Sequence, residues 1–211
     1  MNNAVLHYIY DPLCGWCYGA APLVRAARDV LTVRGHGGGM MTGSRRQQVS
    51  AQLRDYVIPH DHRIAQLTGQ PFGDAYFDGL LRDPDAVFDS APPIAAMLAA
   101  DAVAGGGLDL LARIQTAHYV EGRRIAESSV LIGLAADIGL EEERFAAAFY
   151  LMRGESTQAH INESLALLAQ AGGSGFPTFA IERGGRLQTL DISTYLGQPD
   201  AWREYLKTQA N

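Results

Sequence analysis

The pattern of hydrophobic residues near the start of the chain changes from strand-like to helical within a short segment. Residues 5–10 form a run of apolar, β-branched and aromatic residues that ends at Asp11-Pro12, a turn signal, and this run predicts a core strand. Apolar residues then recur at helical spacing through residues 18–33, which predicts a helix. The glycines of residues 35–39 end this helix, and residues 40–42 are expected to form a second short strand.

The middle of the chain, from residue 44 to about residue 171, has helical periodicity almost throughout. The expected helices lie at residues 47–56, 61–68, 92–104, 108–119, 130–138, 141–151 and 157–171. Ser90 before two prolines is a helix start signal. The acidic run at residues 141–143 complements a helix dipole.

Strand-like patterns return after the glycine-rich residues 172–175. Residues 178–182 and 187–190 flank a glycine pair and predict a β-hairpin, and residues 199–207 predict a final helix. The order indicates an α/β core formed by residues 1–43 and 172–211, with residues 44–171 inserted as an all-helical domain.

Composition and charge narrow the range of functions. The chain has 211 residues, of which 47% are hydrophobic and 19% charged, as is usual for a soluble globular protein. A net charge of −6 offers no basic surface for a nucleic acid or an acidic membrane. The N-terminal segment lacks the features of a secretory signal, and the Ala- and Gly-rich residues 92–108 are too polar and short for a membrane span. We therefore expect a cytoplasmic protein.

The candidate chemistry lies in the only two cysteines, Cys14 and Cys17, which flank Gly15 and Trp16 at a helix start. This spacing places both sulfurs on one helix face, close enough to form a disulfide. Cys14 would lie at the positive end of the helix dipole, which favours its thiolate and predicts that it is the attacking nucleophile. Cys17, one turn further in, would resolve the mixed disulfide.

The cysteine pair has two other interpretations. A structural zinc site needs four ligands, and His60 and His62 are the candidates to complete one, although their spacing does not require it. A pair of buried structural thiols is the other interpretation. Pro177, which precedes a predicted strand, is an ordinary trans proline by default, although a cis proline facing a Cys-x-x-Cys helix is a feature of thioredoxin-like folds.

Four sequence motifs together carry a family resemblance. They are Asp-Pro-Leu-Cys-Gly-Trp-Cys-Tyr-Gly at residues 11–19, Thr-Gly-Gln-Pro-Phe-Gly at 68–73, Ala-His-Tyr-Val-Glu-Gly at 117–122 and Gly-Phe-Pro-Thr-Phe at 175–179. With these motifs the chain resembles the DsbA family of thiol-disulfide oxidoreductases, and within it the cytoplasmic FrnE-type branch. The resemblance implies a thioredoxin-like fold with a helical insertion, catalytic Cys14 and Cys17, and a cis Pro177 opposite them.

The resemblance also implies a substrate surface formed by Gly15, Trp16, Phe176 and Pro177. Expected partners are thiols and disulfides of proteins or small molecules, glutathione among them, and no cofactor or metal is expected. Two positions depart from the family pattern: Gly15 replaces the usual proline, which leaves the direction of the reaction open, and Phe176 is larger than the usual residue before the proline.

Two alternative functions remain at this stage. A neighbouring branch with serine in place of the first cysteine uses glutathione for isomerase or transferase reactions, and Cys14 argues against it. The other is a chaperone-like binding module, against which the complete Cys-x-x-Cys argues. Asp11 is interpreted either as a turn residue or as a group that shifts the ionisation of Cys14 or moves its protons. His118 is interpreted as a core or groove histidine rather than a catalytic base.

Overall fold

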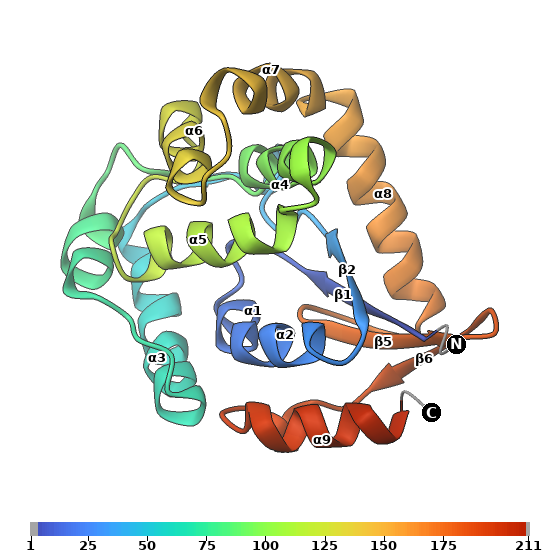
Figure 1. Ribbon diagram of the computed structural model, residues 1–211. Helices are drawn as coiled ribbons and strands as arrows, with labels where there is room; N and C mark the ends of the chain where they lie inside the picture. The colour runs from blue at the N-terminus through green and yellow to red at the C-terminus, as the bar shows by residue number, and fades with distance from the viewer. Residues whose placement is uncertain (1–3, 210–211) are drawn as a thin grey trace.

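A four-stranded mixed sheet forms the centre of the protein. The computed structural model describes residues 4–209, and in it the strands are β1 (Val5–Tyr10), β2 (Thr32–Gly37), β5 (Thr178–Arg183) and β6 (Arg186–Leu190), in the spatial order β2-β1-β5-β6. β1 pairs parallel with β2 and antiparallel with β5, and β5 pairs antiparallel with β6 across the predicted hairpin turn. Helices surround this sheet (Figure 1). The α/β class with a thioredoxin-like core is confirmed.

The position of each strand explains how well it could be predicted. β1 and β5 are central strands whose apolar residues are almost all buried, so both show the expected hydrophobic runs. β2 is an edge strand with mainly polar and glycine residues. Our predictions of a helix through residue 33 and of a strand at residues 40–42 were therefore wrong. The glycines of β2 are needed because a β-carbon on Gly35 would lie 3.0 Å from Leu108, and one on Gly37 would lie 2.8 Å from Ile94.

The first helical segment consists of two helices rather than one. α1 (Gly15–Gly19) carries the cysteine pair, and α2 (Ala21–Arg28) follows after Ala20. α2 packs against the C-terminal helix α9 (Pro199–Gln209). The fully buried ring of Trp202 on α9 lies edge-on to Phe179 of β5, which in turn contacts Tyr8 of β1. These aromatic contacts join α9 to the sheet face that lies under the cysteines.

The helical block between β2 and β5 contains six longer helices. They are α3 (Ala51–Thr68), α4 (Ala91–Ala104), α5 (Gly107–Tyr119), α6 (Ser128–Asp137), α7 (Glu142–Met152) and α8 (Glu155–Gln170). The last five match the expected helices closely. The two helices expected at residues 47–56 and 61–68 are instead one helix, α3, which continues through Pro59 because buried residues on both sides of the proline hold it in place.

The short elements of the block were not predicted. β3 (Gln47–Gln48) pairs with β4 (Val87–Phe88), and a short π-helical turn, η2, covers Ala75–Gly79. Such short pieces lack the periodicity that marks longer elements.

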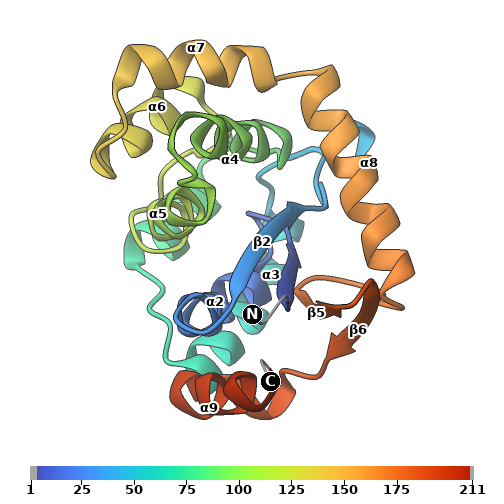
Figure 2. The ribbon, with the colours of Figure 1, turned by 45° about the vertical axis from the view of Figure 1, so that its right-hand side comes forward.

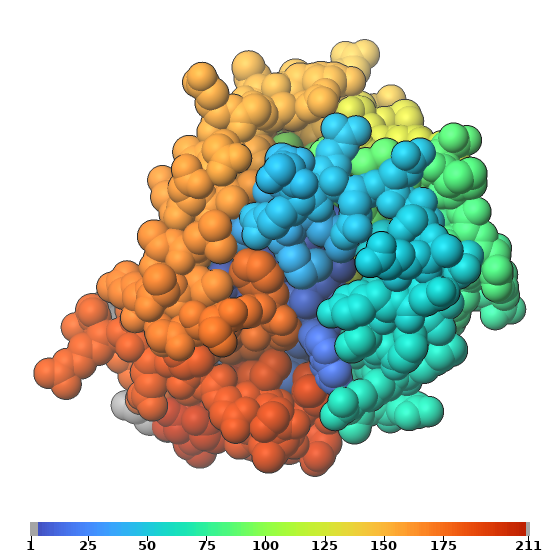
Figure 3. Space-filling view, turned by 180° about the vertical axis from the view of Figure 1, so that it is seen from behind, coloured from blue at the N-terminus to red at the C-terminus, as the bar shows by residue number. Residues whose placement is uncertain are grey.

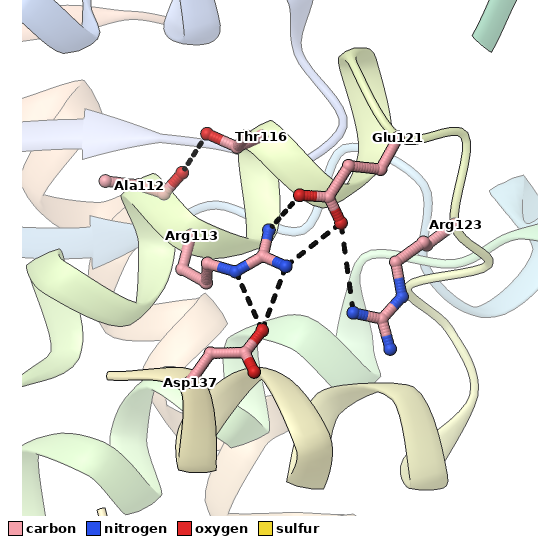
Figure 4. Close-up of polar contacts among 6 residues, drawn as sticks. All are labelled: Ala112, Arg113, Thr116, Glu121, Arg123 and Asp137. Carbon is pink, nitrogen blue, oxygen red and sulfur yellow. Dashed lines mark hydrogen bonds and ion pairs between the residues drawn. The ribbon is translucent and has the colours of Figure 1, made fainter. Parts of the chain in front are cut away.

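Helices α5 and α6 are joined by a cluster of ion pairs (Figure 4). The guanidinium of Arg113 binds both carboxylate oxygens of Glu121, at 2.7 and 3.0 Å, and its Nε lies 2.9 Å from Asp137 on α6.

α8 then runs beside β2 and leads back to the sheet (Figure 2). Within residues 4–209, no helix is both long and apolar enough to cross a membrane.

Candidate active site

The two cysteines lie together at the start of α1. Cys14 is the N-cap residue of this helix, and its Sγ accepts a hydrogen bond from the backbone N–H of Cys17 at 3.4 Å. Both cysteines are free thiols. The sequence-based prediction that they share one helix turn is confirmed, and the backbone N–H shows that the helix start supplies a donor to the outer sulfur.

Cys17 is the inner thiol. Its side chain is completely buried, whereas Cys14 keeps 7% of its surface exposed. Burial raises the pKa of the Cys17 thiol well above its usual value. The two sulfurs therefore differ in access, and the roles of Cys14 as attacking and Cys17 as resolving thiol stay predictions.

The loop before β5 lies against Cys14. The Phe176–Pro177 peptide bond is cis, as the family resemblance implied. The carbonyl oxygen of Phe176 lies 3.6 Å from Cys14 Sγ. The half-buried Phe176 ring packs over the backbone of Gly38, where a β-carbon would lie only 2.0 Å from the ring. The large side chain thus turns toward Gly38, and its backbone faces the sulfur.

The site opens on one face of the molecule. In Figure 3 the blue N-terminal residues lie at the bottom of a furrow between the cyan residues of α3 and the orange-red C-terminal segment. Gly15 and Trp16 are both half-buried. Trp16 lies on α1 next to Cys17, and the carbonyl of the Phe176–Pro177 loop lies against Cys14 Sγ.

Three of the family motifs meet behind α1. The Tyr18 hydroxyl donates to the carbonyl of Pro71 at 2.7 Å, and the side chain of Gln70 donates to the carbonyl of Tyr18 at 3.0 Å. The Tyr18 ring stacks on Tyr119 with 4.7 Å between their centroids. The contact between the second and third motifs is close, because a β-carbon on Gly73 would lie 2.1 Å from the carbonyl oxygen of Val120. The motifs are therefore the packing surfaces that position the cysteine helix.

Asp61 of α3 is a neighbour of the site that the sequence analysis did not identify. A β-carbon on Gly15 would lie 2.6 Å from its Oδ1, and its Oδ2 accepts a hydrogen bond from the Tyr76 hydroxyl at 2.8 Å. Burial raises the pKa of Asp61 to about 6. The available signal was an acidic residue on the buried helix face that also carries Ile64 and Thr68.

Asp11 has a structural role that the sequence left open. Its buried carboxylate accepts hydrogen bonds from Leu13 N–H at 2.9 Å, Met40 N–H at 2.6 Å and the Ser90 hydroxyl at 2.9 Å. The turn interpretation is thus correct, and the carboxylate also ties the glycine-rich loop and the start of α4 to β1. Burial raises its pKa, opposed by these three donors. The Ser90 hydroxyl therefore donates to Asp11, and the Ser90 side chain does not cap α4.

The histidines do not gather at the cysteines. His118 is buried among aromatic rings, its Nδ1 has no hydrogen-bond partner among the described residues, and burial lowers its pKa to about 3. It is a core histidine, in line with the sequence interpretation. His60 and His62 are exposed and stack on Tyr56 and Phe77. Among residues 4–209, no three His, Cys, Asp or Glu side chains are grouped as metal ligands.

Comparison with solved structures finds close relatives. The chain is 64% identical to the cytosolic disulfide reductase DsbM from Pseudomonas aeruginosa, over 97% of this chain and 98% of that one, with a TM-score of 0.92. A structure of DsbM with GSH gives 62% identity over the same shares and a TM-score of 0.90. A candidate protein disulfide isomerase from Nitrosomonas europaea is 29% identical, over 97% of this chain and 96% of that one, with a TM-score of 0.78. No protein-family profile and no curated protein matches the chain.

Proposed function

The chain belongs to the DsbA family of thiol-disulfide oxidoreductases, and we propose that it is a cytosolic disulfide reductase that draws its electrons from glutathione. The observation that carries the proposal is the position of Cys14. Its sulfur caps α1, accepts a hydrogen bond from the N–H of Cys17 and lies 3.6 Å from the Phe176 carbonyl oxygen. The names of the two DsbM structures support reduction as the direction of the reaction and glutathione as the small thiol.

In the proposed reaction two exchange steps reduce the substrate, and glutathione then reduces the enzyme. The Cys14 thiolate attacks one sulfur of a substrate disulfide, forms a mixed disulfide and releases the other substrate sulfur as a thiol after it gains a proton. Cys17 then loses its proton and attacks Cys14, which releases the second substrate thiol and leaves a Cys14–Cys17 disulfide. Two glutathione molecules reduce this disulfide and leave as oxidised glutathione, so two electrons pass to the substrate in each cycle.

The surroundings of the sulfur agree with a reductase. A strong oxidant stabilises its reduced form by many interactions with the thiolate. Among residues 4–209, one hydrogen-bond donor reaches Cys14 Sγ, the backbone N–H of Cys17. We therefore propose that the protein reduces its substrates rather than oxidising them. Gly15, Trp16, Phe176 and Pro177 are proposed as the substrate surface, with the Phe176 carbonyl positioned to accept a substrate N–H.

A reduction assay with glutathione as electron donor tests the proposal. The wild type is expected to reduce a protein disulfide and a glutathione mixed disulfide, and Cys14→Ser is expected to lose both activities. Cys17→Ser is expected to stop at a mixed disulfide on Cys14, detectable by mass spectrometry. If Cys14→Ser retained activity, or if glutathione could not reduce the oxidised protein, the proposed function would be wrong.

A further inference from the structure

The second exchange step requires a proton to leave a fully buried sulfur. Cys17 has no exposed surface, and burial favours its neutral thiol. An attack on the mixed disulfide needs the thiolate. If the proposed function holds, the proton of Cys17 must have a path to solvent that does not pass Cys14, because the bound substrate covers Cys14 at that moment.

Tyr8 lies on the inner side of Cys17. Its ring is fully buried in β1, and its hydroxyl donates to the backbone carbonyl of Cys17 at 3.1 Å. The Cys17 thiol lies near the same hydroxyl and adds to the effect of burial in raising the pKa of Tyr8. Tyr8 therefore stays a neutral hydroxyl, which can turn its hydrogen from the carbonyl to a neighbouring thiolate.

A small pocket, mainly apolar but with a few polar lining residues, reaches Tyr8. It has a volume of about 90 Å³ and lies between α2 and α5, with Tyr8, Val24, Arg25, Leu108 and Gln115 among its lining residues. This volume holds several water molecules. Gln115 is 1% exposed, and its Nε2 has no hydrogen-bond partner among the described residues. Leaving a buried amide without a hydrogen-bond partner costs free energy, so a water molecule in the pocket that accepts from this amide would be stabilised.

The rim of the pocket is charged. Arg28 on α2 binds both oxygens of Asp109 on α5, at 2.5 and 2.9 Å, and Arg25 lines the same pocket. These side chains are partly exposed and connect the pocket to solvent. The pocket thus has a polar inner end at Tyr8 and Gln115 and a charged outer end at the surface.

We infer that this pocket is the proton route of the resolving cysteine, with water between the Tyr8 hydroxyl, the Gln115 amide and the surface. In the resolving step the S–H bond of Cys17 breaks, its proton passes to the Tyr8 oxygen, and the proton that Tyr8 held passes to water in the pocket, so Tyr8 stays neutral. The Tyr8 hydroxyl donates its hydrogen bond to the new thiolate. The thiolate then forms the bond to Cys14, and the bond between Cys14 and the substrate sulfur breaks.

Asp11 is the competing acceptor for this proton. It interacts with Cys17 from the end of β1, but its carboxylate already accepts three hydrogen bonds. Cys14 on α1 and Tyr10 on β1 are the other titratable groups that interact with Tyr8. Of these groups, Tyr8 alone lines the pocket among its described residues.

The test compares Tyr8→Phe with Tyr10→Phe. Tyr10 is the matched control, because it lies two residues along the same strand, stacks on Tyr8, is also buried, and donates its hydroxyl to Met97 instead. Reduced protein is mixed with a small aromatic disulfide, and the release of the first and second thiols is followed by stopped-flow absorbance. Acid-quenched samples are analysed by mass spectrometry for the mixed disulfide on Cys14.

We expect Tyr8→Phe to release the first thiol at the wild-type rate and to release the second about tenfold more slowly, the effect of losing a hydrogen bond to a charged group. Its second step should also need a higher pH. Gln115→Met, which keeps the length of the side chain, should slow the second step as well, and Tyr10→Phe should change neither step.

Equal second steps in Tyr8→Phe and Tyr10→Phe would overturn the inference, as would a second step in Tyr8→Phe that is slow but keeps the pH profile of the wild type. Asp11 would then be the remaining acceptor. Absence of the first thiol release in the wild type would instead contradict the proposed function.

Discussion

The carboxylate of Asp61 lies directly against Gly15, the residue between the two cysteines that departs from the family pattern. A β-carbon at residue 15 would come within 2.6 Å of Asp61 Oδ1 and within 2.9 Å of Ile64 Cδ1. Any larger residue at this position, such as the proline usual in the family, would have to displace one of these side chains, whereas glycine leaves the carboxylate beside α1. The side chain of Asp61 thus occupies the space that a side chain at residue 15 would need.

Replacement of Gly15 by proline should destabilise the protein, although proline suits the first position of a helix. The ring atoms would push against the buried carboxylate and Ile64, and overpacking of this kind costs roughly 1–3 kcal/mol. Urea unfolding of the reduced protein measures the loss. The double variant Gly15→Pro/Asp61→Ala is the control, because removing the carboxylate should restore part of the stability. A stable single variant would show that α1 or α3 shifts freely.

Asp61→Asn should change the pH dependence of Cys14 reactivity. The pKa of Asp61 is raised to about 6 by burial, so its carboxylate becomes negative as the pH rises past 6. Because Asp61 lies against Gly15, the residue after Cys14, we expect this charge to oppose a Cys14 thiolate. We expect the two proteins to react alike at about pH 5 and Asp61→Asn to react up to about tenfold faster at pH 7.5. Rates of iodoacetamide labelling of Cys14 measure this. An unchanged ratio across the pH range would contradict it.

The same carboxylate predicts a pH effect on stability. Its pKa is higher in the folded state than in the unfolded chain, so the folded state holds the proton more tightly. The resulting stability is present below about pH 4 and is lost as the pH rises through about 6, by at most about 3 kcal/mol. The stability of Asp61→Asn relative to wild type should therefore increase between pH 4 and pH 7. Chemical unfolding at both values measures this increase, and a constant difference would contradict it.

Cys14 should be alkylated much faster than Cys17 in the reduced protein. Cys14 is partly accessible, whereas Cys17 is fully buried and its pKa is raised by burial. We expect at least about a tenfold difference at pH 7, since the thiolate is the reactive form. Peptide mapping after brief labelling gives the two rates separately. Equal labelling of the folded protein would reverse the assignment of nucleophile and resolving thiol.

The reduction potential should lie between about −120 mV, the value of a strong oxidant, and about −270 mV, the value of thioredoxin. The N–H donor at Cys14 gives the thiolate moderate stabilisation, and about 30 mV corresponds to about 1.4 kcal/mol for this two-electron couple. Redox titration against glutathione, followed by Trp16 fluorescence, measures it. A potential at or above the oxidising end would indicate a dedicated oxidant.

The sequence by itself determined the parts that depend on local patterns. β1, the hairpin of β5 and β6, the later helices of the insertion and the pairing of Cys14 with Cys17 all follow from periodicity, turn residues or short spacing. The family motifs extended this to the cis bond at Pro177, which local propensity alone did not favour. The division into residues 1–43 and 172–211 around an inserted domain stays a prediction.

Tertiary structure alone decided the features that depend on distant neighbours. β2 is a strand because it pairs with β1 and lies under Ile94 and Leu108, although its own residues predicted the end of a helix. Likewise, Asp61 meets Gly15 only because α3 packs on α1. Burial then changes what the same side chain does: the carboxylate of Asp61 becomes a group that titrates near pH 6 because packing removes its water, and no local pattern encodes that loss.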